Sequence, residues 1–96
     1  MFSLNNKKAV VTGGGSGIGA AVAEVYAKQG AEVHIVELNA DNAQNTLNNI
    51  TAAGGKAFAH TCNVANQAEV IATFNAIGSF TILVNCAGIS HIGRAD

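Results

Sequence analysis

The chain has 96 residues, of which 49% are hydrophobic and 11% are charged, and its formal net charge is −1. This length accommodates at most one small domain. The charge excludes the basic surface that nucleic acids and anionic membranes require, and no apolar run reaches the roughly 18 residues of a transmembrane helix. The lysines near the N-terminus follow its few apolar residues, unlike those of a secretory signal, so we expect a cytoplasmic protein.

The first predicted elements are a strand, a turn and a helix. Residues 7–12 predict a strand with a continuously apolar centre, which is typical of a parallel strand covered on both faces. Residues 17–29 predict a helix that ends at Gly30, the expected C-cap. Ala20, Ala23 and Ala27 give this helix a small-residue face that can approach the sheet closely.

The turn between these elements is a glycine cluster, GGGSGIG, at residues 13–19. Glycine has no Cβ, so the backbone of such a turn can come close to a ligand. The following helix points unpaired N–H groups and its positive dipole end at the turn, where a phosphate is the natural occupant. A phosphate loop of the GxxxxGK[ST] type is excluded, because Ala20 and not lysine follows Gly19.

The second predicted strand, residues 31–36, ends at Glu37, which stands 18 residues after Gly19. An acidic residue about 20 residues beyond a glycine turn is where a carboxylate accepts hydrogen bonds from the ribose hydroxyls of adenosine. The alternative is an ordinary exposed glutamate at a strand end. The upstream glycine turn favours the ribose interpretation.

The remaining residues continue the alternation of helices and strands. Either Asn39 or Asp41 can cap the second helix, and Asn66 with Glu69 forms a pair of the capping-box type for the third. The predicted elements are a helix at 39–53, a strand at 56–61, a helix at 66–77 and a strand at 81–84.

Four stretches, in this order, resemble the short-chain dehydrogenase/reductase family. Residues 12–19 read Thr-Gly-x-x-x-Gly-x-Gly, and the second strand ends at Glu37. Asn63-Val64 follows the third strand, and residues 85–88, Asn-Cys-Ala-Gly, follow the fourth. The resemblance covers essentially the whole chain but only the first part of the family's usual length.

The chain departs from the family pattern at three positions. The family commonly has aspartate where Asn63 stands, and a second asparagine where Cys86 stands. An amide both donates and accepts hydrogen bonds, so the role of the first position survives the change. Glu37 is the third of these positions, because the family more often has aspartate there for NAD. The extended branch of the family has a different glycine spacing and would need glycine at position 16, which is serine here.

The resemblance implies an α/β fold of the Rossmann type, with strand order 3-2-1-4 and helices on both faces of the sheet in a full-length member. It implies hydride transfer between a nicotinamide cofactor and a carbonyl or alcohol carbon, with the cofactor at the carboxyl ends of the strands. The implied cofactor contacts are Gly13, Ser16, Gly17, Ile18 and Gly19 at the pyrophosphate, Glu37 and Leu38 at the adenosine ribose and adenine edge, Asn63 and Val64 at adenine, and Asn85, Ala87 and Gly88 at the nicotinamide ribose.

The cofactor is expected to be NAD in preference to NADP. A 2′-phosphate on the ribose would meet the like charge of Glu37, which is costly in a partly desolvated site. Ser16 offers no cation, whereas relatives that prefer NADP often carry arginine there.

The family's catalytic serine, Tyr-x-x-x-Lys pair and further asparagine have no counterpart in the 96 residues. Tyr26 is followed four places on by Gly30 and not by lysine, and Ser90 has no tyrosine partner. We therefore expect residues 1–96 to be the N-terminal, cofactor-binding part of one domain, without turnover of its own. The expected partners are a small alcohol or ketone substrate and further copies of the protein, with no nucleic acid or membrane.

Two other function classes remain open. The chain could be a non-catalytic nucleotide-binding module with the same site. A methyltransferase also pairs a glycine loop with an acidic residue after its second strand, but the Thr12-Gly13 start and the Asn85-to-Gly88 motif argue against it.

The cysteines and histidines do not indicate a metal centre. Cys62 and Cys86 form no CxxC pair, so neither zinc nor a disulfide framework is implied, and we expect two buried thiols. His34 and His60 fall in or at the end of strands and are expected to be packing or rim residues. His91 stands alone, which argues against a metal-ligand role.

Overall fold

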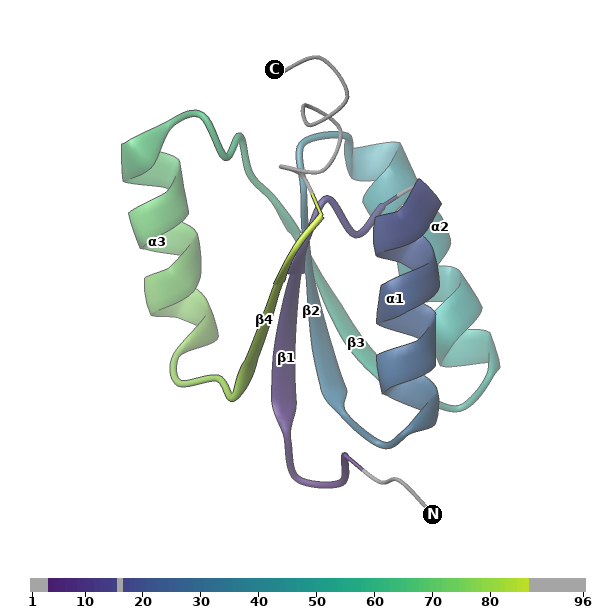
Figure 1. Ribbon diagram of the computed structural model, residues 1–96. Coiled ribbons are helices and arrows are strands. Elements are labelled where there is room, and N and C mark those ends of the chain that lie inside the picture. The colour runs from purple at the N-terminus through teal and green to yellow at the C-terminus, as the bar shows by residue number, and fades with distance from the viewer. Residues whose placement is uncertain (1–3, 16, 87–96) are drawn as a thin grey trace, which may run out of the picture.

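The computed structural model describes residues 4–15 and 17–86, in which strands and helices alternate along the chain (Figure 1). Every predicted element is present, and no boundary differs from the predicted one by more than one residue. The elements are β1 (Lys8–Thr12), α1 (Gly17–Lys28), β2 (Glu32–Glu37), α2 (Ala40–Ala52), β3 (Lys56–Thr61), α3 (Gln67–Ile77) and β4 (Ile82–Asn85).

The four strands form one parallel sheet with the order β3-β2-β1-β4, as the family resemblance implies. Thr12 pairs in register with Val36 on one side and with Asn85 on the other, so the carboxyl ends of the strands meet at one edge. Helices α1 and α2 cover one face of the sheet, and α3 lies on the other (Figure 1). Among the described residues, no helix has the length and apolarity needed to cross a membrane.

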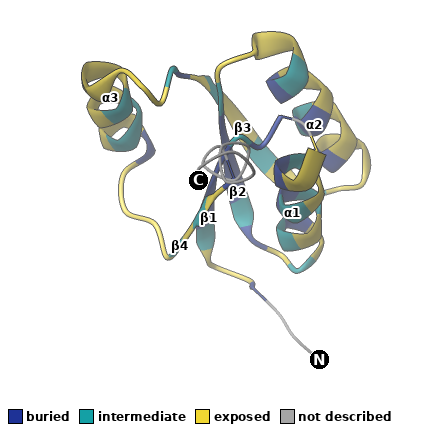
Figure 2. Cartoon of the chain, turned by 45° about the horizontal axis from the view of Figure 1, so that its top comes forward, coloured by how far each residue is buried: buried dark blue, intermediate teal, exposed yellow. Residues whose placement is uncertain are grey.

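Strand β1 is the centre of the core. Ala9, Val10 and Val11 are fully buried, which confirms the prediction of a strand covered on both faces (Figure 2). Side chains alternate between the faces of a strand, so Val11 packs in the cluster beneath α1 and α2 while Val10 packs on the α3 side. Ala23 and Ala27 are buried and Ala20 is half-buried, so α1 approaches the sheet with its small residues, as predicted.

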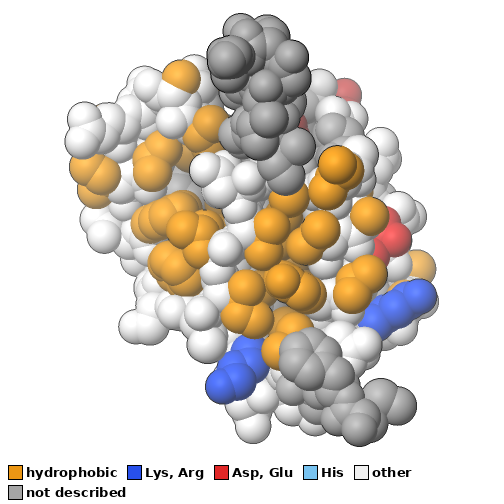
Figure 3. Space-filling model, viewed as in Figure 1, with side chains coloured by type: hydrophobic (Ala, Val, Ile, Leu, Met, Phe, Trp, Pro, Cys, Tyr) orange, Lys and Arg blue, Asp and Glu red, His pale blue; other side chains and the backbone are white. Residues whose placement is uncertain are grey.

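The outer strands are less covered than β1 and β2. Leu83 in β4 is 51% exposed and Phe58 in β3 is 49% exposed. Within the described residues, no strand pairs with the outer edge of β4. Hydrophobic side chains gather on the molecular face that carries β4, between α1 and α3 (Figure 3). In the described sheet, the side chains of β1 and β2 are thus mostly buried, and β4 forms an apolar border.

Cys62 and Cys86 are both buried and unpaired, as expected. They follow β3 and β4, the two outermost strands, so β2 and β1 separate them. Burial raises the pKa of the Cys86 thiol.

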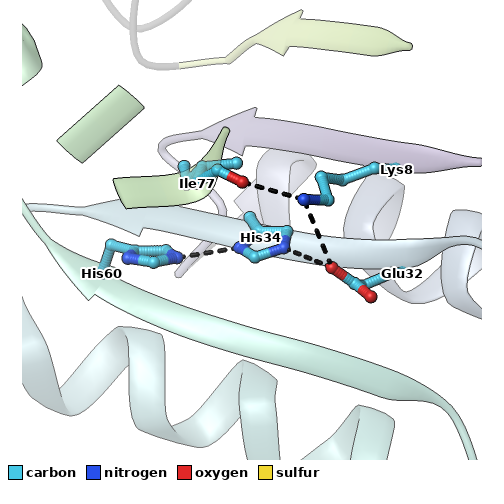
Figure 4. A network of polar contacts seen from close by, with 5 residues as sticks. All are labelled: Lys8, Glu32, His34, His60 and Ile77. Atoms are coloured by element: carbon cyan, nitrogen blue, oxygen red, sulfur yellow. Dashed lines mark hydrogen bonds and ion pairs between the residues drawn. The ribbon is translucent and has the colours of Figure 1, made fainter. Parts of the chain in front are cut away.

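A polar network crosses the α3 side of the sheet, from Lys8 and Glu32 at the amino ends of β1 and β2 to His60 in β3 (Figure 4). His34 is buried, and its Nε2 lies 2.7 Å from Glu32 Oε2 while its Nδ1 lies 2.9 Å from His60 Nε2. Lys8 Nζ lies 3.9 Å from Glu32 Oε2 and donates a hydrogen bond of 2.8 Å to the Ile77 carbonyl. His34 and His60 are therefore packing residues, as predicted, but they are also joined in a hydrogen-bonded chain that spans β2 and β3.

Candidate functional site

The glycine turn is hydrogen-bonded to the sheet at its start and packs against α1 at its end. The Gly13 N–H donates to the Val36 carbonyl at 2.7 Å, which continues the β1–β2 pairing by one residue. Gly13 and Gly17 have φ angles of 70° and 56°, in the left-handed region that glycine adopts without strain. A Cβ on Gly19 would overlap the backbone of Gly13, so only a hydrogen fits there. The turn and the first turn of α1 are packed backbone to backbone.

The start of α1 is suited to an anion. Its first turn contains no acidic side chain, and Gly17 and Ile18 are exposed. The first N–H groups of an α-helix have no carbonyl partner within the helix and lie at its positive dipole end. Ser16, which was predicted to line the same turn, lies outside the described residues.

Glu37 ends β2 next to this turn, and backbone amides hold its carboxylate. Oε1 accepts a hydrogen bond from the Gly15 N–H at 2.9 Å, and Oε2 accepts one from the Asn39 N–H at 3.1 Å. Asn39 is the N-cap of α2, because its side chain accepts from the Asn42 N–H at 3.0 Å. Leu38, which lies between Glu37 and Asn39 in the chain, is 64% exposed. The carboxylate is thus held between the glycine turn and the start of α2.

The loop after β3 has a capping arrangement of its own. Asn66 caps α3 by accepting from the Glu69 N–H at 3.1 Å, as predicted. In a standard capping box the Glu69 side chain would accept from the Asn66 N–H. Here it accepts from the Asn63 N–H at 2.9 Å instead. Asn63 Oδ1 in turn accepts from the Ala65 N–H at 2.9 Å. These bonds fix the loop and leave Val64, at 47% exposure, on its surface.

The ends of β1 and β4 are joined through side chains. Thr12 Oγ1 donates to Asn85 Oδ1 at 2.8 Å, so a side-chain hydrogen bond links the two strand ends. The Cys86 N–H donates to the Thr12 carbonyl at 3.0 Å and extends the strand pairing. Ala87 and Gly88 lie outside the described residues.

The predicted site residues that are described therefore come from the ends of all four strands, and the parallel topology brings those ends to a single edge of the sheet. Sequence reasoning missed two contributors: Gly15, which donates to Glu37, and Asn42, whose Cβ lies beside Gly15. The run of three glycines at 13–15 was the available signal, but it does not say which glycine meets the carboxylate. Within the described ranges, no three His, Cys, Asp or Glu side chains are grouped as a metal site.

Comparison with known proteins identifies the architecture. Residues 7–96 match the family model described as short chain dehydrogenase. D-threitol dehydrogenase of Mycolicibacterium smegmatis is 39% identical over 99 residues, which covers 99% of this chain and 38% of the relative. The chain thus spans a little over a third of the length of that relative.

Two solved structures have the same fold. A 7α-hydroxysteroid dehydrogenase complexed with NADH and 7-oxo glycochenodeoxycholic acid superposes with a TM-score of 0.80 and 37% identity, over 86% of this chain and 34% of that one. A metagenomic short-chain oxidoreductase in complex with NADP gives a TM-score of 0.80 and 31% identity, over 83% and 38% of the two chains. With its glycine turn, strand order and family match, this chain belongs to the short-chain dehydrogenase family.

Proposed function

We propose that this chain forms the NAD-binding part of an oxidoreductase that transfers hydride between nicotinamide and the carbonyl or alcohol carbon of a small molecule. The observation that carries the proposal is the Glu37 carboxylate, held by two backbone amides beside a glycine turn that opens a helix. When bound, the nicotinamide supplies or accepts the hydride. The residues of this chain bind and orient the cofactor.

The donor set fits a dinucleotide. A diphosphate needs backbone N–H groups and room for close approach, which the start of α1 and the Gly13–Gly19 packing provide. Ser16, Gly17 and Ile18 would line the pyrophosphate. Glu37 accepts one backbone hydrogen bond on each carboxylate oxygen, and each oxygen keeps a second lone pair for a ribose hydroxyl.

Adenine would lie against Leu38 and the loop that carries Asn63 and Val64. The exposed Leu38 and Val64 side chains offer apolar contacts. Because Asn63 Oδ1 already accepts from Ala65, its amide nitrogen is the group that would donate to a ring nitrogen of adenine. The family's aspartate has no such donor, so this chain would hold adenine differently.

The nicotinamide ribose would lie at the other side of the edge, against Asn85, Ala87 and Gly88. The Thr12–Asn85 hydrogen bond keeps the end of β4 aligned with β1. This alignment would position the backbone after Asn85 beside the ribose.

We propose NAD in preference to NADP because Glu37 would face the 2′ position of the ribose. Solved relatives include one with NADH and one with NADP, so the family alone leaves the choice open. A 2′-phosphate would bring negative charge next to a carboxylate already held in place. No arginine or lysine occupies residues 9–27, so the turn supplies no compensating cation.

The test is a titration of the longest natural protein that carries this sequence with NAD and with NADP, in wild type and in Glu37→Ala. We expect NAD to bind more tightly to wild type, and the preference to fall by about tenfold or more in the variant, since a hydrogen bond to a charged group is worth about 1.5–3 kcal/mol. Ala21→Ser, at an exposed position of α1, is the control. NADP binding as tight as NAD binding in wild type would contradict the proposed choice.

We further propose that residues 1–96 are the cofactor-binding part of a cytoplasmic protein that forms homo-oligomers. On their own, these residues should turn over no substrate and should not persist as a monomer. The family's catalytic serine and Tyr-x-x-x-Lys pair, which would assist proton transfer to the substrate oxygen, have no counterpart in the 96 residues. The apolar border at β4, where Leu83 is exposed and no other strand of the described residues pairs with the outer edge, would favour association. Sizing chromatography with light scattering tests this, and a folded monomer that persists on dilution would contradict it.

A further inference from the structure

We propose that Gly15 is the positioning residue that holds the Glu37 carboxylate at the ribose site, and that the missing side chain at position 15 sets the preference for the unphosphorylated ribose. This inference rests on the proposed function. It assigns the source of selectivity to a residue other than the one that would touch the ribose. The two residues are joined by the hydrogen bond from the Gly15 N–H to Glu37 Oε1, 2.9 Å long.

The space around Gly15 is already full. A Cβ built at this position would lie 2.6 Å from Glu37 Cγ, 2.7 Å from Glu37 Oε1 and 2.8 Å from Asn42 Cβ. All three distances are shorter than the closest approach of real Cβ atoms. The φ angle of Gly15 lies outside the left-handed region, unlike those of Gly13 and Gly17. Alanine at position 15 would therefore cause steric overlap without backbone strain.

The two neighbours of Gly15 differ in how easily they can move. Asn42 lies in the first turn of α2, and its backbone N–H is bonded to the Asn39 cap, so its Cβ moves only with the helix. The Glu37 side chain has three rotatable bonds and ends in the carboxylate. A methyl group at position 15 should thus displace the Glu37 side chain and break its bond to the Gly15 N–H.

Displacing this carboxylate removes two effects at once. The ribose hydroxyls lose their acceptor, which weakens NAD binding, and a 2′-phosphate loses the negative charge that opposes it. Gly15→Ala is therefore expected to reproduce most of the effect of deleting the Glu37 carboxylate, although Glu37 is still present. A glycine that only shaped the turn would change the binding of both dinucleotides by the same factor.

The experiment is a double-mutant cycle in the longest natural protein that carries this sequence. The dissociation constants of NAD and NADP are measured for wild type, Gly15→Ala, Glu37→Ala and the double variant. We expect the ratio of the NADP constant to the NAD constant to fall about tenfold in each single variant. In the Glu37→Ala background, Gly15→Ala should change the ratio no further, because the side chain through which it acts is gone.

Gly55→Ala is the matched control. Gly55 also has a φ outside the left-handed region, and its Cβ would lie 2.8 Å from Ile50 Cγ2. It lies at the start of β3, before Lys56, at the opposite end of the sheet from Glu37. It should lower stability and leave the ratio unchanged. Thermal melts of all variants supply a second readout, since Gly15→Ala should destabilise the chain less when Glu37 is already alanine.

The outcomes separate this inference from the proposed function. If Glu37→Ala lowers the ratio and Gly15→Ala does not, the positioning role is wrong and the proposed function stands. An equal effect of Gly15→Ala in both backgrounds also overturns the positioning role. If wild type binds neither dinucleotide, the proposed function fails and this inference fails with it.

Discussion

The two ends of strand β2 each carry a glutamate, and the two are held in opposite ways. Glu37, at the carboxyl end, accepts hydrogen bonds from two backbone amides, those of Gly15 and Asn39. Glu32, at the amino end, is held by side chains: His34 at 2.7 Å and Lys8 at 3.9 Å. Backbone donors do not titrate and are placed by the turn itself. Side-chain donors depend on three strands being in register and on the protonation of imidazole.

The titration of the two regions should differ for this reason. The hydrogen bond from His34 lowers the pKa of Glu32 and outweighs its partial burial, with smaller contributions from the charges of His34, Lys8 and Lys56. Burial, followed by the charge of His34, lowers the pKa of His60. The contact between the two imidazoles holds a single proton, so it is lost if both rings are protonated. The network is thus a pH-sensitive element outside the candidate cofactor site.

The largest effect is expected where backbone packs on backbone. Gly19→Ala should lower the free energy of unfolding by about 3 kcal/mol and abolish measurable dinucleotide binding, because its Cβ overlaps the Gly13 backbone, which cannot rotate away. Urea unfolding and NAD titration measure the two effects. Ala20→Ser, one residue on, is the control. Wild-type binding in Gly19→Ala would show that the turn is looser than the packing indicates.

A smaller loss is expected from the side-chain network. His34→Ala removes the buried ring that stacks on Phe58 at a centroid distance of 4.9 Å and bonds both Glu32 and His60. We expect the free energy of unfolding to fall by about 2 kcal/mol, with NAD binding unchanged. A change in NAD affinity without a change in stability would contradict the separation of the two regions.

The Thr12–Asn85 bond provides a side-chain contact at the carboxyl edge that does not titrate. Thr12→Val keeps the shape and removes the donor of the 2.8 Å bond, at a cost of about 1 kcal/mol. The loss should be the same at pH 5.5 and pH 7.5, and it should shrink in an Asn85→Ala background. A pH-dependent loss would mean that the Thr12–Asn85 bond is coupled to the titration of the histidine network.

The smallest effect is the pH dependence of the unmodified chain. Because the pKa of His60 is lower in the folded chain than its usual 6.5, the unfolded chain binds more protons near this value. The stability that this shift contributes is present above pH 6.5 and is lost as the pH falls through the folded pKa. The lowered pKa of Glu32 adds a second loss below its usual value of 4.5.

Urea unfolding across this pH range measures both losses. His60→Asn should remove the first and keep the second, whereas Glu37→Gln should leave the first unchanged. Stability that rises as the pH falls from 7 to 5.5 would contradict the lowered pKa of His60.

The sequence alone predicted the helices and strands and their order along the chain. The period of apolar residues, the caps at Asn39 and Asn66, and the glycines between elements are local signals, and each element appears within one residue of its predicted bounds. Glu37 was predicted from its distance along the chain to the glycine turn.

Only the tertiary structure decided which atoms hold these groups. That Gly15, among three consecutive glycines, donates to Glu37 depends on how the turn lies against the end of β2. The chain of Glu32, His34 and His60 depends on the register between β2 and β3, since a one-residue slip would turn one histidine to the other face of the sheet. Residue types and spacing determine local conformation, but contacts between strands depend on the packing that brings distant residues together.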